Sequence, residues 1–347
     1  MKKETVLAII GVAIVLALVW LGFSKKREEG KKPAKPTVVV YVSEKRSFSE
    51  PILKDFERAS GIEVRAVYDT EKTDGTSIVN RLITEKPHPK ADVYWANEPV
   101  RAELLKQKGV LAPYASRKCE TIPASFKDRK HYWCGFSARV RLLVADANLS
   151  PVPDSIFAYT DPVFEGKGVI ARPHILDITA AHMAALFVEL GNDRAEAFMN
   201  AMHKNGVMMS PDTRESAELV AMGHAGFALV NSDDAVAQIR KGAKIKIIYP
   251  DQKKGQIGAF VVPNAVMMIK NAPHPENAKK LIDYLLSKET EAKLAKADCA
   301  LIPLHAGVSG PDELRPIDQI RIMDIDYAKI AKKMIEIQPF LHWWARM

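Results

Sequence analysis

The sequence of 347 residues has few cysteines and lacks the short motifs of several enzyme classes. Its three cysteines, Cys119, Cys134 and Cys299, include no Cys-x-x-Cys pair, which argues against a zinc ribbon or a thioredoxin-type redox site. A Gly-x-Ser-x-Gly nucleophile motif and a phosphate-binding loop are both missing. There is no internal repeat and no low-complexity tract. These absences favour an ordinary globular protein without a recognisable catalytic motif.

The positive charge of the chain is concentrated at its N-terminus. The net charge is +8, and residues 1–37 contain eight Lys or Arg and three Glu, so they supply +5 and leave +3 for the rest. A remainder this close to neutral has little attraction for nucleic acid, and no nucleic-acid-binding motif is present. We therefore expect no nucleic-acid partner.

An apolar segment near the N-terminus predicts export. Val6 to Phe23 is an uncharged run of 18 residues preceded by two lysines, which fits a secretory signal or an uncleaved membrane anchor. Basic residues also follow the run, and these favour the cytoplasmic side, although the rule weakens for large translocated domains. We expect an extracytoplasmic protein, periplasmic or at the cell surface, either anchored through residues 6–23 or secreted. Residues 25–36 read as a charged, proline-containing tether.

Beyond residue 37 the chain alternates between strand and helix patterns. Three β-branched or apolar runs, at 37–42, 62–68 and 91–95, are each followed by a segment with helical periodicity. Three such units in a row predict an α/β fold with a parallel sheet. The rhythm breaks at 132–146, where 135–144 reads as one long strand that crosses between lobes, and again at 250–257.

The stretch from Gly223 to Ala235 combines a buried strand with an acidic end. Phe227 to Val230 is apolar, and Asn231-Ser232-Asp233-Asp234 follows where such a strand ends. One interpretation is that Ser232, Asp233 or Asp234 caps a helix that starts at Ala235. The other is that these residues face a ligand, because ligands of open α/β sheets bind beyond the carboxyl ends of strands.

Several strings resemble the extracytoplasmic solute-binding proteins of ABC importers, most closely the subgroup that binds ferric ions. They are Ala-Ser-Gly-Ile-Glu-Val (59–64), Ala-Asp-Val-Tyr-Trp-Ala-Asn-Glu (91–98), Gly-Phe-Ser-Ala-Arg-Val-Arg (135–141) and the segment 271–286. The resemblance covers about residues 38–310. It implies a two-lobed periplasmic-binding-protein fold with a hinge and an interlobe cleft, and an ABC permease as partner. After the segment 1–37, one lobe would hold 38–140 and 259–347, and the other 141–258.

The resemblance also implies a set of ligand-binding positions, but not the iron ligands themselves. Asn97 stands where the iron binders have a carboxylate, and Asp233-Asp234 stands where they have two tyrosines. The strand-end histidine is replaced by Ser43, Glu44 and Lys45. Carboxylates at Asp233 and Asp234 could still bind ferric iron, which accepts oxygen ligands, and a small polar solute is the alternative. The expected ligand-binding residues are Ser43, Glu44, Asn97, Arg139, Thr179, Ser232, Asp233 and Asp234.

Other assignments remain open at this stage. The protein could be a membrane-tethered sensor ectodomain, or Asp233-Asp234 could be the paired carboxylates of a hydrolase. His174, Asp177 and His182 lie close in sequence but fit no standard metal spacing.

The adjacent carboxylates Asp233 and Asp234 repel each other, so the ligand should bring positive charge or hydroxyls to them. An anionic part of the ligand should lie toward Thr179 and Arg139. For an exported chain we also predict a Cys119–Cys134 disulfide with Cys299 free.

Overall fold

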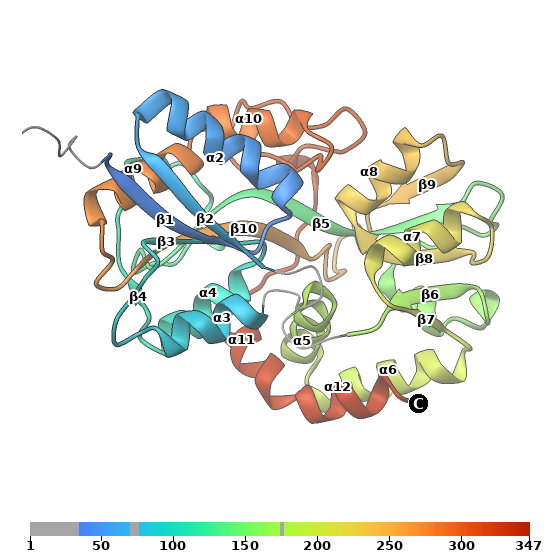
Figure 1. The fold of residues 1–347 in the computed structure, drawn as a ribbon. Coiled ribbons are helices and arrows are strands. Elements are labelled where there is room, and N and C mark those ends of the chain that lie inside the picture. The colour runs from blue at the N-terminus through green and yellow to red at the C-terminus, as the bar shows by residue number, and fades with distance from the viewer. Residues whose placement is uncertain (1–34, 70–75, 174–176) are drawn as a thin grey trace, which may run out of the picture. The chain divides into compact units, whose positions relative to one another are not determined.

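The structure, a computed structural model, describes residues 35–69, 76–173 and 177–347 (Figure 1). The predicted apolar span Val6–Phe23 and His174 lie outside the described residues. Within the described ranges, no helix combines the length and the apolar character needed to cross a membrane. Residues 37–347 form one compact unit, and the following paragraphs concern that unit.

The strands of this unit hydrogen-bond in the order β2-β1-β3-β10-β5-β8-β6-β7, with β4 added to β10 and β9 to β5. Their ranges are β1 (Thr37–Val42), β2 (Glu63–Tyr68), β3 (Val93–Ala96), β4 (Leu111–Ala112), β5 (Cys134–Asp146), β6 (Gly168–Ala171), β7 (Met208–Ser210), β8 (Phe227–Asn231), β9 (Ile245–Ile248) and β10 (Val261–Ile269). The predicted parallel pairing holds for β1 with β2 and β3, and for β6 with β7 and β8. The sheet as a whole is mixed, because β10 and β5 run antiparallel to their neighbours.

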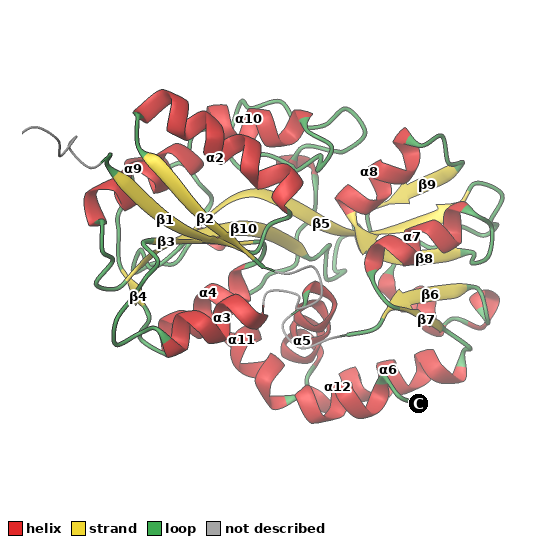
Figure 2. Cartoon of the chain, in the orientation of Figure 1, coloured by secondary structure: helices red, strands yellow, loops and turns green. Residues whose placement is uncertain are grey.

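Helices cover both faces of the strands (Figure 2). Their ranges are α2 (Arg46–Ser60), α3 (Thr76–Thr84), α4 (Pro99–Gln107), α5 (Ile178–Leu190), α6 (Asn192–Lys204), α7 (Thr213–Ala221), α8 (Ser232–Arg240), α9 (Pro275–Leu285), α10 (Lys288–Lys296), α11 (Tyr327–Glu336) and α12 (Gln338–Trp344). In Figure 1, α2, α9 and α10 lie on one side of β1, β2, β3 and β10, and α3, α4 and α11 lie on the other. Strands with both faces covered must be apolar throughout, which is why β1, β3 and β8 are buried almost end to end.

The strand order has two halves, β2-β1-β3-β10 and β8-β6-β7, and strand β5 belongs to both. Its residues through Val140 pair with β10, and its residues from Arg141 onward pair with β8. This is the long crossing strand that the sequence predicted. Because successive side chains of a strand point to opposite faces, Arg139 and Arg141 lie on the same face, on either side of the position where the pairing changes. Both arginines are buried.

The C-terminal segment contacts elements from both halves. Helix α11 packs against α4 and also against α5. In α12, the buried Trp344 donates its indole N–H to the carbonyl of Met199 in α6 at 2.8 Å, and its own carbonyl lies 3.0 Å from the ring of His203. The end of the chain therefore stabilises the arrangement of α4, α5 and α6.

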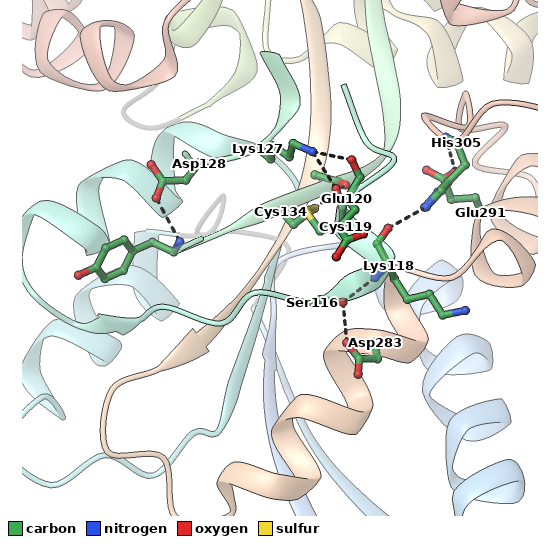
Figure 3. Close-up of a disulfide and its surroundings, with 12 residues drawn as sticks. Ser116, Lys118, Cys119, Glu120, Lys127, Asp128, Cys134, Asp283, Glu291 and His305 are labelled. Atoms are coloured by element: carbon green, nitrogen blue, oxygen red, sulfur yellow. Dashed lines mark hydrogen bonds and ion pairs between the residues drawn. A yellow bond between two sulfur atoms is a disulfide. The ribbon is translucent and has the colours of Figure 1, made fainter. Parts of the chain in front are cut away.

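The structure confirms the predicted disulfide between Cys119 and Cys134, and Cys299 is free and buried (Figure 3). The enclosed loop is also held by hydrogen bonds. Lys127 donates its ammonium to the carbonyls of Cys119 and Glu120 at 3.0 and 2.9 Å. Just before the loop, Ser116 donates to Asp283 of α9 at 2.6 Å. These contacts do not depend on the disulfide and would hold the loop without it.

We predict that replacing Cys119 and Cys134 together by serine lowers the free energy of unfolding and leaves the fold intact. The two cysteines are 15 residues apart. Chain-entropy models give about 3 kcal/mol for closing a loop of about that length in the unfolded state. Urea unfolding of the two proteins measures the difference, and Cys299→Ser is the control for loss of a thiol. Equal stability of the double variant and the wild type would contradict the prediction.

Candidate functional site

Ser232, Asp233 and Asp234 follow β8 directly and form the first turn of α8, and they do not cap the helix. The helix begins at Ser232, and the cap position is Asn231, whose side chain makes no capping hydrogen bond. The capping interpretation of Ser232, Asp233 and Asp234 is therefore wrong, and so is the predicted helix start at Ala235. All three side chains are buried. Ser232 instead accepts a hydrogen bond from the backbone N–H of Val140 at 3.2 Å, which ties α8 to the crossing strand.

Arg139 joins the two sides of the site. Its Nη2 donates to Glu44, in the loop after β1, at 2.8 Å, and its Nε donates to Asp233 of α8 at 3.1 Å. The exposed fractions of the three side chains are 4% for Arg139, 1% for Glu44 and 6% for Asp233, so both ion pairs are shielded from water. Such pairs are much less screened than surface pairs, and breaking one by removing a partner is costly.

Hydrogen-bonding capacity at this centre is incompletely used. Within the described part of the chain, Nη1 of Arg139 and Oδ1 of Asp233 are both buried and make no hydrogen bond. Most buried polar atoms in proteins have a partner, because leaving one unsatisfied costs about 1–3 kcal/mol. A free donor and a free acceptor at the same buried centre are the features expected where a polar ligand binds.

A second chain of hydrogen bonds runs beside the first. Arg141 donates from Nη1 to Asn231 at 3.1 Å, Asn231 donates to Thr213 at 3.1 Å, and Thr213 donates to Asp234 at 2.6 Å. Burial raises the pKa of Asp234 to about 6, and the charge of Asp233 adds to the increase. Burial lowers the pKa of Arg141 to about 10, and its Nε makes no hydrogen bond to the described residues.

The predicted residues Ser43 and Asn97 make their hydrogen bonds within the half that contains β1 and β3. The Ser43 hydroxyl lies 2.8 Å from that of Tyr94 and donates to Asp69 at 3.1 Å. Asn97 accepts a hydrogen bond from Arg101 at 2.8 Å. Glu44, which follows β1 in the same half, is connected to Asp233 of α8 through Arg139, which binds both. The structure thus unites Glu44, Arg139, Ser232 and Asp233, whereas Ser43 and Asn97 lie in a neighbouring network.

The N-terminus of α5 supplies a further polar element. Asp177 caps the helix by accepting from the N–H of Ala180 at 2.6 Å, and Thr179 in the first turn is buried. The charge of Asp177 acts on Arg141 and opposes the lowering of its pKa by burial. His182 lies deeper in α5, stacked on Phe260 with ring centroids 4.9 Å apart. Burial and nearby Arg141 hold the pKa of His182 well below its usual value, so it is a neutral packing residue.

Two residues that sequence reasoning did not select belong to these networks. Thr213 connects Asn231 to Asp234, and Tyr94 contacts Ser43. Only Thr213 had a usable signal, because it begins α7 just after the end of β7. Tyr94 lies inside β3, where the sequence gives no reason to select it. The rule that ligands bind beyond strand ends selects Thr213 as readily as Asp233.

Comparison with known proteins identifies the class that this fold and site define. The model of a family described as bacterial extracellular solute-binding protein matches residues 88–333. A periplasmic protein of Salmonella typhimurium named for 2-aminoethylphosphonate binding is 27% identical over 260 residues, 74% of each chain. The major ferric iron-binding protein of Neisseria meningitidis is 22% identical, over 87% of this chain and 91% of its own.

Solved structures share the fold at low sequence identity. Iron-bound HitA from Pseudomonas aeruginosa superposes with a TM-score of 0.77 at 18% identity, covering 88% of this chain and 99% of its own. AfuA from Actinobacillus pleuropneumoniae, with fructose-6-phosphate bound, gives 0.74 at 19% identity, covering 90% and 98%. The fold is therefore the two-lobed α/β fold of periplasmic binding proteins, as predicted.

The chain belongs to the bacterial extracellular solute-binding protein family. Its function is that of a solute-binding component of an ABC importer, which confirms the role predicted from the sequence.

We predict that Asp234→Asn changes how stability depends on pH. Because the pKa of Asp234 is raised from 3.8 to about 6, the folded state keeps a proton that the unfolded state releases. The stability this contributes is present below about pH 4 and is lost as the pH rises through about 6. Burial and the charge of Asp233 raise the pKa of Asp234, and they outweigh Lys45 and Arg139, which lower it.

The difference in unfolding free energy, wild type minus Asp234→Asn, should fall by up to about 3 kcal/mol from about pH 4 to about pH 7. Urea unfolding across this range measures it, with exposed Asp312→Asn as the matched control. Parallel pH profiles for the wild type and Asp234→Asn would show that the pKa of Asp234 is not raised.

Proposed function

We propose that the protein binds a small zwitterionic organic solute outside the cytoplasm and delivers it to an ABC permease. The observation that carries the proposal is that buried hydrogen-bond donors and a buried acceptor without partners occur in the same region. Arg139 and Arg141 each have a buried N–H without a described partner, and Asp233 has a buried oxygen without one. A ligand with one anionic and one cationic end would satisfy both kinds of atom.

Two other buried carboxylates, Asp92 and Glu291, provide an internal comparison. Asp92 accepts hydrogen bonds from the backbone of Val39 and His274, and it also contacts the His274 ring at 2.9 Å. Glu291 accepts from the backbone of Ser137, Leu304 and His305, and it also contacts the His305 ring. Both groups use both carboxylate oxygens to connect distant segments. Asp233 has one oxygen left over, which supports a ligand-binding role.

The anionic end of the ligand is assigned to Arg141, Arg139 and the start of α5 with Thr179. Guanidinium groups and helix N-termini both favour phosphate, phosphonate or carboxylate groups. The cationic end, an ammonium group, is assigned to Asp233 and Asp234, with Glu44 and Ser232 beside them. An aminoalkylphosphonate has this combination of charges, and one relative is named for such a compound. Ser43 and Asn97 remain proposed contacts on the other side.

Ferric iron is the alternative ligand, and the donor set supports it less well. Other relatives are named for iron uptake or ferric iron binding. In the described ranges, however, no group of three or more His, Cys, Asp or Glu side chains is arranged to hold a metal ion. Asp233 is engaged by Arg139 and Asp234 by Thr213, so iron would have to displace an arginine to use the proposed ligands Asp233 and Asp234.

The family and the structural neighbours are binding proteins, which supports a role without catalysis over a paired-carboxylate hydrolase. Residues 6–23 are proposed to direct export and to anchor the chain or be cleaved. A sensor ectodomain would share this binding fold, and adjacent genes for a permease and an ATPase would support the importer assignment over the sensor.

We predict that replacing Asp233 and Asp234 by alanine abolishes stabilisation by the ligand while the protein still folds. A ligand that binds only the folded state at a concentration of 100 times its Kd raises the unfolding free energy by about 2.7 kcal/mol. A thermal-shift panel of aminoalkylphosphonates, sugar phosphates, amino acids and ferric citrate measures this in the wild type and the variant. The control replaces two exposed carboxylates, Asp312 and Asp318, by alanine.

The wild type and the control should respond to the same zwitterionic compound, and the Asp233/Asp234 variant should not. Retention of the full shift by the variant would show that the two carboxylates do not face the ligand. A shift with ferric citrate alone would overturn the zwitterion assignment and favour iron.

A further inference from the structure

Arg139 lies between carboxylates from opposite sides of the site. Glu44 and Asp233 are 95 and 94 residues away from it in sequence, and each binds a different nitrogen of the same guanidinium group. Asp234 follows Asp233 in the first turn of α8 and is buried as well. One fixed positive charge therefore lies between two buried carboxylates, and a third, Asp234, follows next in sequence.

With the guanidinium in place, the described residues contain no group of three or more His, Cys, Asp or Glu side chains arranged to hold a metal ion. Without this charge, the same carboxylates would be left unneutralised and would attract a hard cation. Hard multivalent metal ions prefer carboxylate oxygens, and several carboxylates in one buried place repel unless a cation compensates. Oδ1 of Asp233 is buried and already lacks a partner within the described residues. The guanidinium group neutralises the cluster and occupies the space between Glu44 and Asp233.

We infer that Arg139 is a specificity-determining residue that acts as a built-in cation, excluding multivalent metal ions from the carboxylates Glu44, Asp233 and Asp234. The inference rests on the proposed function for what the site binds instead, namely the ammonium group or a hydroxyl donor of an organic solute at Asp233. The planar guanidinium suits this role, because its fork binds two carboxylates at once in a fixed geometry. A metal ion would have to displace it from both.

The experiment is a calorimetric titration of the full chain with terbium(III), a hard trivalent ion that stands in for ferric iron. Four proteins are compared: the wild type, Arg139→Gln, the double variant Arg139→Gln/Asp233→Asn, and Arg240→Gln. Arg240 is a matched control, because it also lies between two carboxylates, Glu313 at 2.8 Å and Asp298 at 3.9 Å, but at the surface.

We expect Arg139→Gln to bind one terbium ion at least tenfold more tightly than the wild type. The double variant should lose this gain, since it lacks one of the carboxylates. Arg240→Gln should match the wild type, because its carboxylates face water and are not pre-arranged around a buried position. Equal affinity of Arg139→Gln and the wild type would overturn the inference, and so would an equal gain in Arg240→Gln.

Circular dichroism and thermal melting check that Arg139→Gln is folded. If it is not, Arg139→Lys takes its place. Lysine keeps a charge but, as a single ammonium group, lacks the fork that holds both carboxylates, so its terbium affinity should still exceed that of the wild type. Wild-type affinity in a folded Arg139→Lys would then contradict the inference.

The terbium titration does not depend on the identity of the natural solute. The thermal-shift panel with the wild type tests the proposed function separately. A gain of terbium binding together with no response to any zwitterion would leave Arg139 as a barrier to metal ions and would reject the zwitterion assignment alone.

Discussion

The two ion pairs of Arg139 are the interaction on which the rest of the site depends. Both are buried, and the desolvation of three charged groups is offset only while the guanidinium keeps both partners. They connect the end of β1 to the start of α8, at the position where β5 changes its pairing partner. Ser232 strengthens the same junction by accepting from the N–H of Val140. The proposed binding residues and the junction between the two halves are therefore the same part of the protein.

Under the proposed function, this arrangement would connect ligand binding to the movement of the two halves. Proteins of this architecture close around their ligands by hinge motion. Separation of the halves would break at least one pair of Arg139, and leave Glu44 or Asp233 to water or to the ligand. A solute with its own charged groups can replace those contacts. Helix α11, which packs on both α4 and α5, must adjust when the halves move.

The sequence predicted the fold well, because the signals for it are local. Apolar runs mark β1, β3 and β8, and the long strand β5 contains the apolar run Leu142–Ala145. The Cys119–Cys134 pair needed only a count and an expectation of export. The contacts of the site were less accessible. The pairing of Arg139 with Glu44 and Asp233 spans more than 90 residues in each direction and has no sequence signature. The start of α8 was misplaced by three residues, because Ser and Asp are as common in a first helical turn as at a cap.

The most direct test of the account is a competition experiment read by native mass spectrometry. The full chain is stripped of ligand by unfolding and refolding, and is then offered ferric citrate and a mixture of aminoalkylphosphonates and amino acids in equal amounts. The account predicts a complex with one organic zwitterion per protein and no iron. A complex with one iron per protein and no organic solute would show that the carboxylates around Arg139 bind metal, and would contradict the account.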